Sequence, residues 1–371
     1  MHFVCPTEEL AKAAEQVAPV TSEKTPLPIL TNLLIEAKAD SIRLVASDLE
    51  IWVERRLPAL VKDTGSATVP GDLFLNVLKS LRNRGDVEVQ TAANGSVKVT
   101  APGSEYNLLS LSALEFPDLP EIEDPAKITL PTKQYIELVE KVAFAVAKDE
   151  ARQSMRGVKT EWDGSTLRMV ATDTHRLAKV EAALPSQGMA DMIETIVPLK
   201  AAQAVSRVAE SEELDFYIAG NRVKYETPLA TIVGSTITSP YPNYQRVIPT
   251  EFTRRWQIHV SELKPALRTL QPLAVPAAGK VSFEMGKSSD GNDSLIITAR
   301  HEQYGEGREE IGVVAEGDTV QLACNVKYLL DAIDAMGGDN LYIELTDPLR
   351  PLVLKPAEDE NYLCIVMPMA L

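Results

Sequence analysis

Apolar residues recur at helical spacing in six stretches of the chain. In each stretch they occupy positions i, i+3, i+4 and i+7, a pattern that predicts an amphipathic helix with one buried face. Three of these helices are expected to bury Leu10, Ala13, Ala14, Val17, Tyr135, Leu138, Val139, Val142, Leu263, Ala266, Leu267 and Leu270. The other three are expected to bury Phe74, Val77, Leu78, Leu81, Ala201, Ala204, Val205, Val208, Val326, Leu329, Leu330 and Ile333.

Both sets of predicted helices repeat at about one third of the chain length. Each helix of the first set follows a short apolar strand and a hydroxyl residue that is expected to cap it. These cap residues, 125 and 129 residues apart, are Thr7, Thr132 and Ser261. The second set follows residues 128 and 127 positions apart, namely Pro70, Pro198 and Asn325. The repetition predicts three similar modules with internal pseudo-symmetry, an organisation that does not suggest one catalytic cleft.

Strands of alternating character lie between the helices, and turns containing Gly95, Gly164 and Gly291 are expected to join them as hairpins. The sequence therefore predicts an α+β fold of three repeated modules, each an antiparallel sheet with two helices on one face. Segments 116–127 and 239–254 are rich in proline and are predicted to be linkers. The expected domains are residues 1–120, 126–246 and 254–371.

The overall charge argues against tight nucleic-acid binding. The 371 residues carry 53 acids and 37 bases, a net charge of −16, whereas affinity for phosphate comes mainly from clustered Lys and Arg. The outer faces of the helices are less acidic than the chain as a whole, and an ordinary solvated face explains them as well as a binding face does. Their bases are Lys12, Lys79, Arg82, Arg84, Lys133, Lys141, Lys200, Arg207, Lys264 and Arg268.

Other global features indicate a cytoplasmic protein without a cofactor. Three widely spaced cysteines do not form a disulfide framework, and the start of the chain does not read as a signal peptide. No apolar run reaches about 18 residues, so no membrane span is predicted. The common phosphate-binding, zinc-protease and hydrolase motifs are absent from the sequence.

Three segments have unusual chemistry. Asp173 and His175 alternate along a predicted strand and could face a metal or a substrate, although no further ligand cluster lies nearby in sequence. Segment 239–247 combines aromatic residues, prolines and Arg246. The chain ends in an apolar run containing Met367 and Met369, which must pair with a sheet or bind a partner.

Several short motifs carry a resemblance to a known family over the whole length. They are residues 25–30 (TPLPIL), 32–34 (NLL), 47–50 (SDLE), 116–119 (FPDL), 171–178 (ATDTHRLA), 241–244 (YPNY), 246–249 (RVIP) and 366–369 (VMPM). In this order and spacing, the chain resembles the bacterial DNA polymerase III beta subunit, the sliding clamp.

The resemblance implies a non-catalytic processivity factor. Two subunits would close head to tail into a ring around double-stranded DNA, with helices lining the hole and sheets forming the wall. Topology then retains the ring, and DNA contacts without sequence specificity can stay weak despite the negative charge. The residues expected to face DNA are Lys24, Lys79, Arg82, Lys141, Lys200 and Arg207. The dimer interface is expected to join Tyr106 and Leu108 to Leu270 and Leu273.

The resemblance also implies a pocket between the second and third domains. It would bind short linear peptides of the replicative polymerase, the clamp loader, repair proteins and translesion polymerases. Leu177, Val247, Ile365 and Met367 would form its floor, with His175 and Arg246 at the polar margin. The full set is Arg152, Met155, Thr172, Thr174, His175, Arg176, Leu177, Pro242, Arg246, Val247, Pro351, Ile365, Met367, Pro368, Met369 and Leu371.

The sequence departs from the family pattern in three places that bear on these sites. Ala370 stands where relatives often have a basic residue, and Thr174 stands where some relatives have Gly, which would narrow that wall of the pocket. Asp149 and Glu150 lie in a loop expected near DNA. The docking motifs have no evident counterpart in the other modules, so partner recognition is expected at one junction. Two other interpretations remain open: a peptide-binding scaffold that does not encircle DNA, and a metal-dependent hydrolase using Asp173 and His175.

Overall fold

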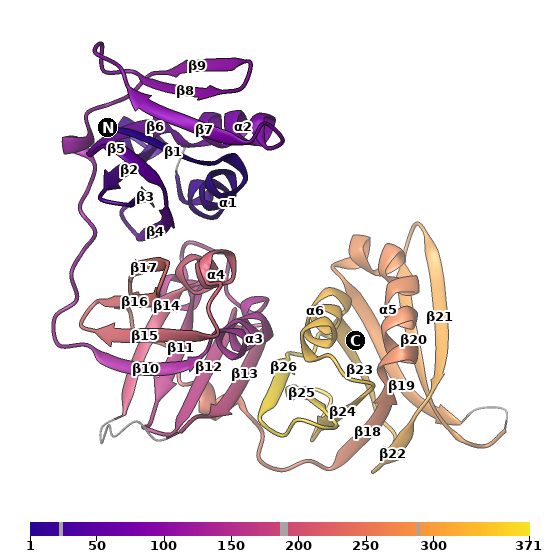
Figure 1. Ribbon diagram of the computed structural model, residues 1–371. Helices are drawn as coiled ribbons and strands as arrows, with labels where there is room; N and C mark the ends of the chain where they lie inside the picture. Colours follow the sequence, from indigo (N-terminus) through magenta and orange to yellow (C-terminus); the bar gives the residue numbers. More distant parts are fainter. Residues whose placement is uncertain (22–24, 186–191, 288–289) are drawn as a thin grey trace. The chain divides into compact units, whose positions relative to one another are not determined.

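The protein forms two compact units. The structure, a computed structural model, describes residues 1–21, 25–185, 192–287 and 290–371 (Figure 1). The first unit contains residues 1–136 and 200–236, and the second contains residues 137–199 and 237–371. The middle predicted module, residues 126–246, therefore contributes to both units.

The six predicted helices are present. The first set is α1 (Thr7–Val17), α3 (Thr132–Ala143) and α5 (Val260–Ala274), and the second is α2 (Gly71–Leu81), α4 (Leu199–Val208) and α6 (Val326–Met336). Every apolar stripe position predicted from the sequence is buried. Short 3-10 helices are η1 (Ala18–Val20), η2 (Pro28–Thr31), η3 (Ala113–Glu115), η4 (Gln153–Arg156), η5 (Tyr244–Val247) and η6 (Val275–Ala277).

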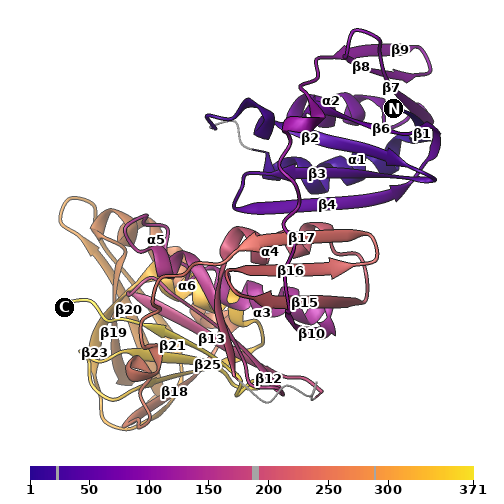
Figure 2. The same ribbon diagram turned by 90° about the vertical axis from the view of Figure 1, so that its left-hand side faces the viewer.

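The first unit has two antiparallel sheets. The larger has the order β10 (Ala126–Pro131), β15 (Glu213–Ala219), β16 (Arg222–Thr227), β17 (Ala230–Ser235), β4 (Ile51–Pro58), β3 (Ser41–Ser47), β2 (Asn32–Lys38) and β6 (Gly65–Pro70) (Figure 2). The smaller has the order β5 (Leu60–Asp63), β1 (His2–Pro6), β7 (Asp86–Thr91), β8 (Val97–Ala101) and β9 (Ser104–Leu108).

The second unit also has two antiparallel sheets. The larger has the order β14 (Ile193–Pro198), β11 (Gly157–Trp162), β12 (Thr166–Thr172), β13 (Arg176–Ala183), β26 (Tyr362–Val366), β25 (Leu352–Pro356), β24 (Asn340–Leu345), β18 (Arg254–His259) and β22 (Val314–Glu316). The smaller has the order β21 (Gly305–Gly312), β20 (Asp293–His301), β19 (Lys280–Lys287) and β23 (Gln321–Asn325).

Successive modules are joined by strand pairing across their edges. In the first unit β17 pairs with β4, with Ile232 opposite Val53. In the second unit β13 pairs with β26, with Leu177 opposite Ile365. These pairings satisfy the backbone groups of strands that would otherwise be open edges, and they bring the end of the chain beside the middle module.

A backbone hydrogen bond repeats at the start of the three helices of the first set. The N–H groups of Thr7, Thr132 and Val260 donate to the carbonyls of Gly85, Glu212 and Asp339, at 3.1, 2.9 and 2.9 Å. Each bond ties the helix start to the loop that follows a helix of the second set. The three modules therefore share one local design.

The expected capping by hydroxyl residues is wrong. Thr7 is the first residue of α1, and its buried Oγ1 donates to the Gly85 carbonyl at 2.6 Å. Thr132 opens α3, and its Oγ1 has no hydrogen-bond partner among the described residues. Ser261 is already inside α5. In the second set Asn325 does cap its helix, because its Oδ1 accepts the N–H groups of Lys327 and Tyr328 at 2.9 and 3.3 Å.

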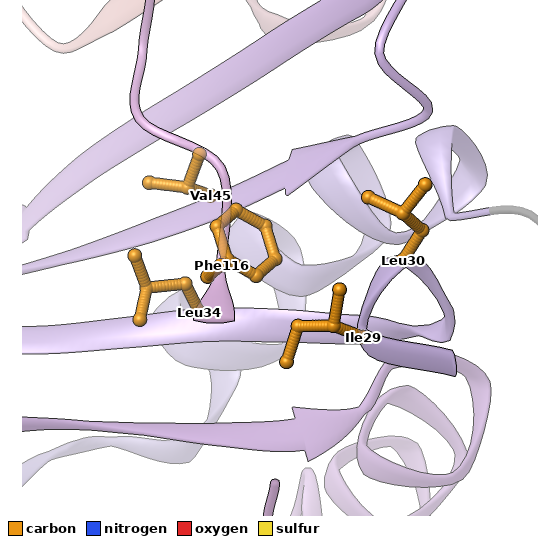
Figure 3. Close-up of a cluster of buried hydrophobic side chains, with 5 residues drawn as sticks. All are labelled: Ile29, Leu30, Leu34, Val45 and Phe116. Atoms are coloured by element: carbon orange, nitrogen blue, oxygen red, sulfur yellow. The ribbon is translucent and has the colours of Figure 1, made fainter. Parts of the chain in front are cut away.

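The predicted linkers contain anchored aromatic residues. Phe116, at the start of the first, is buried against Ile29, Leu30, Leu34 and Val45 (Figure 3). Tyr244, in the second, is buried in a similar cluster in the second unit. The linkers are therefore partly packed against their modules.

Candidate functional site

The turn between β12 and β13 is organised by Asp173. Its carboxylate accepts the N–H groups of His175 and Arg176, both at 3.0 Å, and the Nε of Arg176 at 3.0 Å. Thr174 has a φ of 78°, a conformation that few non-glycine residues adopt. The Asp173 carboxylate is thus already occupied by hydrogen bonds within the turn. The described residues contain no group of three His, Cys, Asp or Glu that could hold a metal. The arrangement does not favour the hydrolase interpretation.

A small apolar groove lies beside this turn. Its volume is about 170 Å³, and its lining residues are Met155, Thr172, Thr174, Arg176, Leu177, Pro242, Asn243, Tyr244, Val247, Ile365 and Met367. Leu177 and Ile365 are each only 2% exposed and form the floor. Val247 and Met367, expected in the floor, are 45% and 36% exposed and form the margin. A buried floor with exposed apolar margins suits short apolar side chains of a ligand.

Tyr244 connects the groove to a buried ionic network. Its hydroxyl donates to Glu161 at 2.9 Å, and Glu161 pairs with Arg168 at 2.9 Å. Arg168 also donates to Glu181 at 2.6 Å. Burial, reinforced by the hydrogen bond to Glu161, raises the pKa of Tyr244 to about 12. The phenol is therefore a neutral donor that fixes the wall of the groove.

The C-terminal residues are held by backbone hydrogen bonds. Met367 N–H donates to the His175 carbonyl at 2.9 Å, and Met369 N–H donates to the Ala323 carbonyl at 2.7 Å. The tail is thereby attached to the second-module turn and to β23. Its last residue, Leu371, is 65% exposed and does not line the groove.

A second cavity of about 450 Å³ adjoins the same turn. It includes Arg152, His175, Arg176, Lys327 and Tyr328 among its lining residues. Arg176 is almost fully buried, pairs with Asp331 at 2.6 Å, and stacks 4.6 Å above the Tyr328 ring. Burial acts to raise the pKa of Asp331, but hydrogen bonds from Lys327 and Arg176 outweigh it and lower that pKa. Arg176 is therefore held in one position by these contacts and lines both cavities.

The structure brings together many of the expected peptide-site residues but not all. Nine line the groove, while Arg152 and His175 line only the neighbouring cavity. The remaining expected residues, which line neither, are Arg246, Pro351, Pro368, Met369 and Leu371. Asn243 and Tyr244 line the groove although the sequence did not predict them as site residues. The 241–244 motif, Tyr-Pro-Asn-Tyr, was the signal that could have identified them.

Most of the basic residues expected to face DNA are already paired with acids. Glu15 contacts both Lys79 and Arg82, at 3.3 and 2.5 Å. Lys141 pairs with Asp359 at 2.8 Å, and Lys200 pairs with Asp48. Arg207 is exposed on α4, and Lys24 lies outside the described residues. The helix faces carry less unpaired positive charge than the sequence suggested.

The residues expected at a dimer interface differ in accessibility. Leu108 and Leu270 are 5% and 2% exposed and pack inside their own units. Tyr106 and Leu273 are half-buried. Tyr106 lies on β9, an edge strand of the first unit, while Gly307 of edge strand β21 approaches both Leu270 and Leu273 in the second. Both edges present unpaired backbone groups within the described residues.

None of the described helices combines the length and the apolar character needed to cross a bilayer.

Comparison with known proteins matches successive parts of the chain to the domains of one family. The N-terminal, central and C-terminal domains of the DNA polymerase III beta subunit match residues 1–120, 129–243 and 245–370. The beta sliding clamp of Chlamydia muridarum is 26% identical over 372 residues, covering 100% of this chain and 99% of the relative.

Solved structures agree with the sequence comparison. The DNA polymerase III beta subunit of Thermotoga maritima has a TM-score of 0.92 at 26% identity, with 100% of this chain and 99% of that chain covered. The beta subunit of Pseudomonas aeruginosa has a TM-score of 0.92 at 26% identity, with 100% of both chains covered. With all three family domains matched in order, this chain belongs to the DNA polymerase III beta subunit family.

Proposed function

We propose that this protein is a DNA sliding clamp, a non-catalytic processivity factor that encircles duplex DNA and tethers DNA-processing proteins. The observation that carries the proposal is the threefold repetition of one helix–sheet design along a chain that matches the three beta-subunit domains in order. A repeated architecture, with no candidate metal cluster among the residues that the structure describes, suits a ring that acts by encircling DNA. The proposed domains are residues 1–120, 126–246 and 254–371, and the proposed location is the cytoplasm.

The DNA-facing residues in this proposal are Lys24, Lys79, Arg82, Lys141, Lys200 and Arg207. Four of them are paired with carboxylates, so each phosphate contact competes with an existing ion pair. Exposed pairs of this kind contribute about 0–1 kcal/mol, so phosphate can displace them at little cost. Weak, exchangeable contacts are what a sliding ring requires, because topology supplies retention.

The partner site in this proposal is the groove beside the Asp173 turn. It would bind a short linear peptide through aliphatic and aromatic anchors, with Leu177 and Ile365 below them and Met367 and Val247 beside them. The replicative polymerase, the clamp loader, repair proteins and translesion polymerases would compete for it. The buried Tyr244–Glu161–Arg168 network supports this use, since it holds the groove wall in one conformation.

The assembly in this proposal is a head-to-tail homodimer. Strand β9 of one subunit would pair with β21 of the other and extend both small sheets. Tyr106 and Leu273 would contact across this junction. Leu108 and Leu270 would support it from within, because both already pack inside their own subunits.

Retention on circular DNA tests the proposal. The protein is placed on a nicked circular plasmid by its clamp loader, and protein remaining on the DNA is measured by gel filtration in high salt. A ring stays on the circle and leaves after a restriction enzyme linearises it. Equal loss from both forms contradicts encirclement and favours a peptide-binding scaffold.

A further inference from the structure

The turn that shapes the peptide groove has a counterpart in the first module. Asp48 accepts the N–H groups of Glu50 and Ile51 at 3.0 and 2.9 Å, as Asp173 accepts those of His175 and Arg176. Ser47 Oγ accepts the N–H of Leu49 at 2.9 Å, as Thr172 Oγ1 accepts that of Thr174 at 3.2 Å. Leu49 has a φ of 73°, close to the 78° of Thr174. The expectation that the docking motifs have no counterpart is therefore wrong for this turn.

The elements around the turn also correspond. Helix η2 precedes β2 as η4 precedes β11, which places Leu30 where the second module has Met155. The Leu30–Met155 and Leu49–Thr174 pairs are each separated by 125 residues. Phe116 and Val45 belong to one buried cluster in the first unit (Figure 3), and Tyr244 and Val170 belong to one in the second.

A groove of about 470 Å³ opens beside this turn. Its lining residues are Leu27, Pro28, Ile29, Leu30, Leu49, Leu111, Glu115 and Pro117. Ile29 and Leu30 are buried and belong to the cluster in Figure 3, so they form a rigid floor. Leu27, Leu49 and Leu111 are 46%, 43% and 42% exposed and form apolar walls.

Leu49 has a costly conformation for an exposed leucine. A positive φ strains a non-glycine residue, and asparagine or glycine would suit this position better. Because the Leu49 side chain is exposed to water, burial of apolar surface does not offset this strain. Strained, exposed apolar residues of this kind are typical of ligand-binding surfaces.

The titratable residue in the lining of this groove is acidic. Among the described residues that line it, Glu115 is the titratable one, and exposed Glu50 and Asp118 directly follow the lining residues Leu49 and Pro117. We propose that the first-module groove is a second docking site, and that its occupant is a short apolar peptide segment flanked by Lys or Arg. Acidic margins attract such flanks, while the leucine walls accept its apolar side chains.

Two fluorescein-labelled synthetic peptides test this proposal by fluorescence anisotropy on the full-length protein. They share an apolar centre of leucine and phenylalanine, and one carries Lys flanks while the other carries Glu flanks. The Lys-flanked peptide is expected to bind more tightly. The double variant Leu49→Asn/Leu111→Ser should weaken its binding about tenfold, and asparagine suits the positive φ of residue 49. Glu115→Lys should weaken the Lys-flanked peptide and strengthen the Glu-flanked one.

Matched variants separate this groove from other surfaces. Leu60→Asn alters a 66% exposed leucine on β5 and should leave binding unchanged. Met367→Ser weakens the peptide groove, which also accepts apolar side chains, so the titrations are carried out in this background. Failure here is then distinguishable from failure of the proposed function. Three results overturn the proposal: no binding of the Lys-flanked peptide to the Met367→Ser protein, equal affinity of that protein for both peptides, or no weakening when Leu49→Asn/Leu111→Ser is added to it. A change in oligomeric mass of the double variant would assign the groove to a second copy and overturn the peptide as occupant.

Discussion

The backbone N–H of Met367 donates a 2.9 Å hydrogen bond to the carbonyl oxygen of His175. This bond joins the end of the chain to the turn after β12, which lies almost two hundred residues earlier. It places the Met367 side chain at the margin of a groove whose floor is contributed by the neighbouring strands β13 and β26. Met367 is therefore part of the proposed peptide site and is already positioned before a ligand binds.

Replacing Met367 by serine should weaken peptide binding. The backbone hydrogen bond to His175 survives the change, but an apolar wall is lost, and we expect about a tenfold loss of affinity. Isothermal titration with a short peptide ending in aliphatic and aromatic residues measures it. Met192→Ser, at a 57% exposed methionine, is the matched control. Unchanged affinity in Met367→Ser would show that the peptide binds elsewhere.

Releasing the cations held by Glu15 should strengthen DNA binding. Glu15→Gln frees Lys79 and Arg82, so the variant should bind linear duplex more tightly at low salt. The slope of log affinity against log salt should steepen by about 0.9 for each additional phosphate that the freed cations neutralise. Glu226→Gln removes the same charge from the Lys224 pair on β16, and it is the control. Equal slopes in the two variants would contradict a DNA-facing role for α1 and α2.

Charged substitutions at the half-buried residues of the proposed dimer junction should separate the two subunits. Leu273→Glu or Tyr106→Glu should convert the dimer to a folded monomer, because each introduces charge at the proposed β9–β21 contact. Sedimentation velocity gives the mass, and circular dichroism reports whether the fold is retained. Leu108→Glu should instead lower thermal stability, since Leu108 is 5% exposed within its own unit. A dimer that persists in both Leu273→Glu and Tyr106→Glu would contradict this interface.

The Asp331–Arg176 ion pair should stabilise the folded protein by an amount that depends on pH. The pKa of Asp331 is lowered in the folded protein, because hydrogen bonds from Lys327 and Arg176 outweigh the opposite effect of burial. The contribution is therefore present above the ordinary pKa of 3.8 and is lost as pH falls through the lowered value. Urea unfolding of the wild type and Asp331→Asn at several pH values measures it. Their stability difference should shrink with acid, and a constant difference would contradict the assignment.

The three thiols should be unreactive until the protein unfolds. Cys5, Cys324 and Cys364 are free and buried, and burial raises the pKa of each thiol to about 12. Little thiolate is present at neutral pH, and reagents cannot reach the sulfur atoms. A colourimetric thiol reagent should therefore react slowly in buffer and rapidly in denaturant. Fast reaction of a native thiol would indicate local opening of its strand.

Local patterns predicted much of the fold because they act within one element. The apolar stripes identified all six helices, and the repeat spacing identified three modules, since helix periodicity and turn chemistry are short-range properties. Capping was the exception. The Thr7 hydroxyl donates its hydrogen bond to the carbonyl of Gly85, 78 residues away, and no local pattern indicates this contact.

The candidate site was predictable only as a set of motifs. The residues around 171–178, 241–247 and 365–367 were identified from the sequence, and nine of the predicted residues line the groove. Tyr244 was missed as a site residue because its role depends on a hydrogen bond to Glu161, 83 residues away. Arg152 and His175 line the neighbouring cavity, because their directions depend on the Asp173 turn and on stacking with Tyr328.

The sequence by itself determined the helices, the repeat and the family, since each depends on residues close together or on the order of short motifs. The tertiary structure alone decided which strand edges meet, which helix cations are neutralised, and that the first module has a groove like the one beside Met367. Those features depend on contacts between segments far apart in the chain. Their energies arise only when folding brings charges, edges and apolar surfaces together.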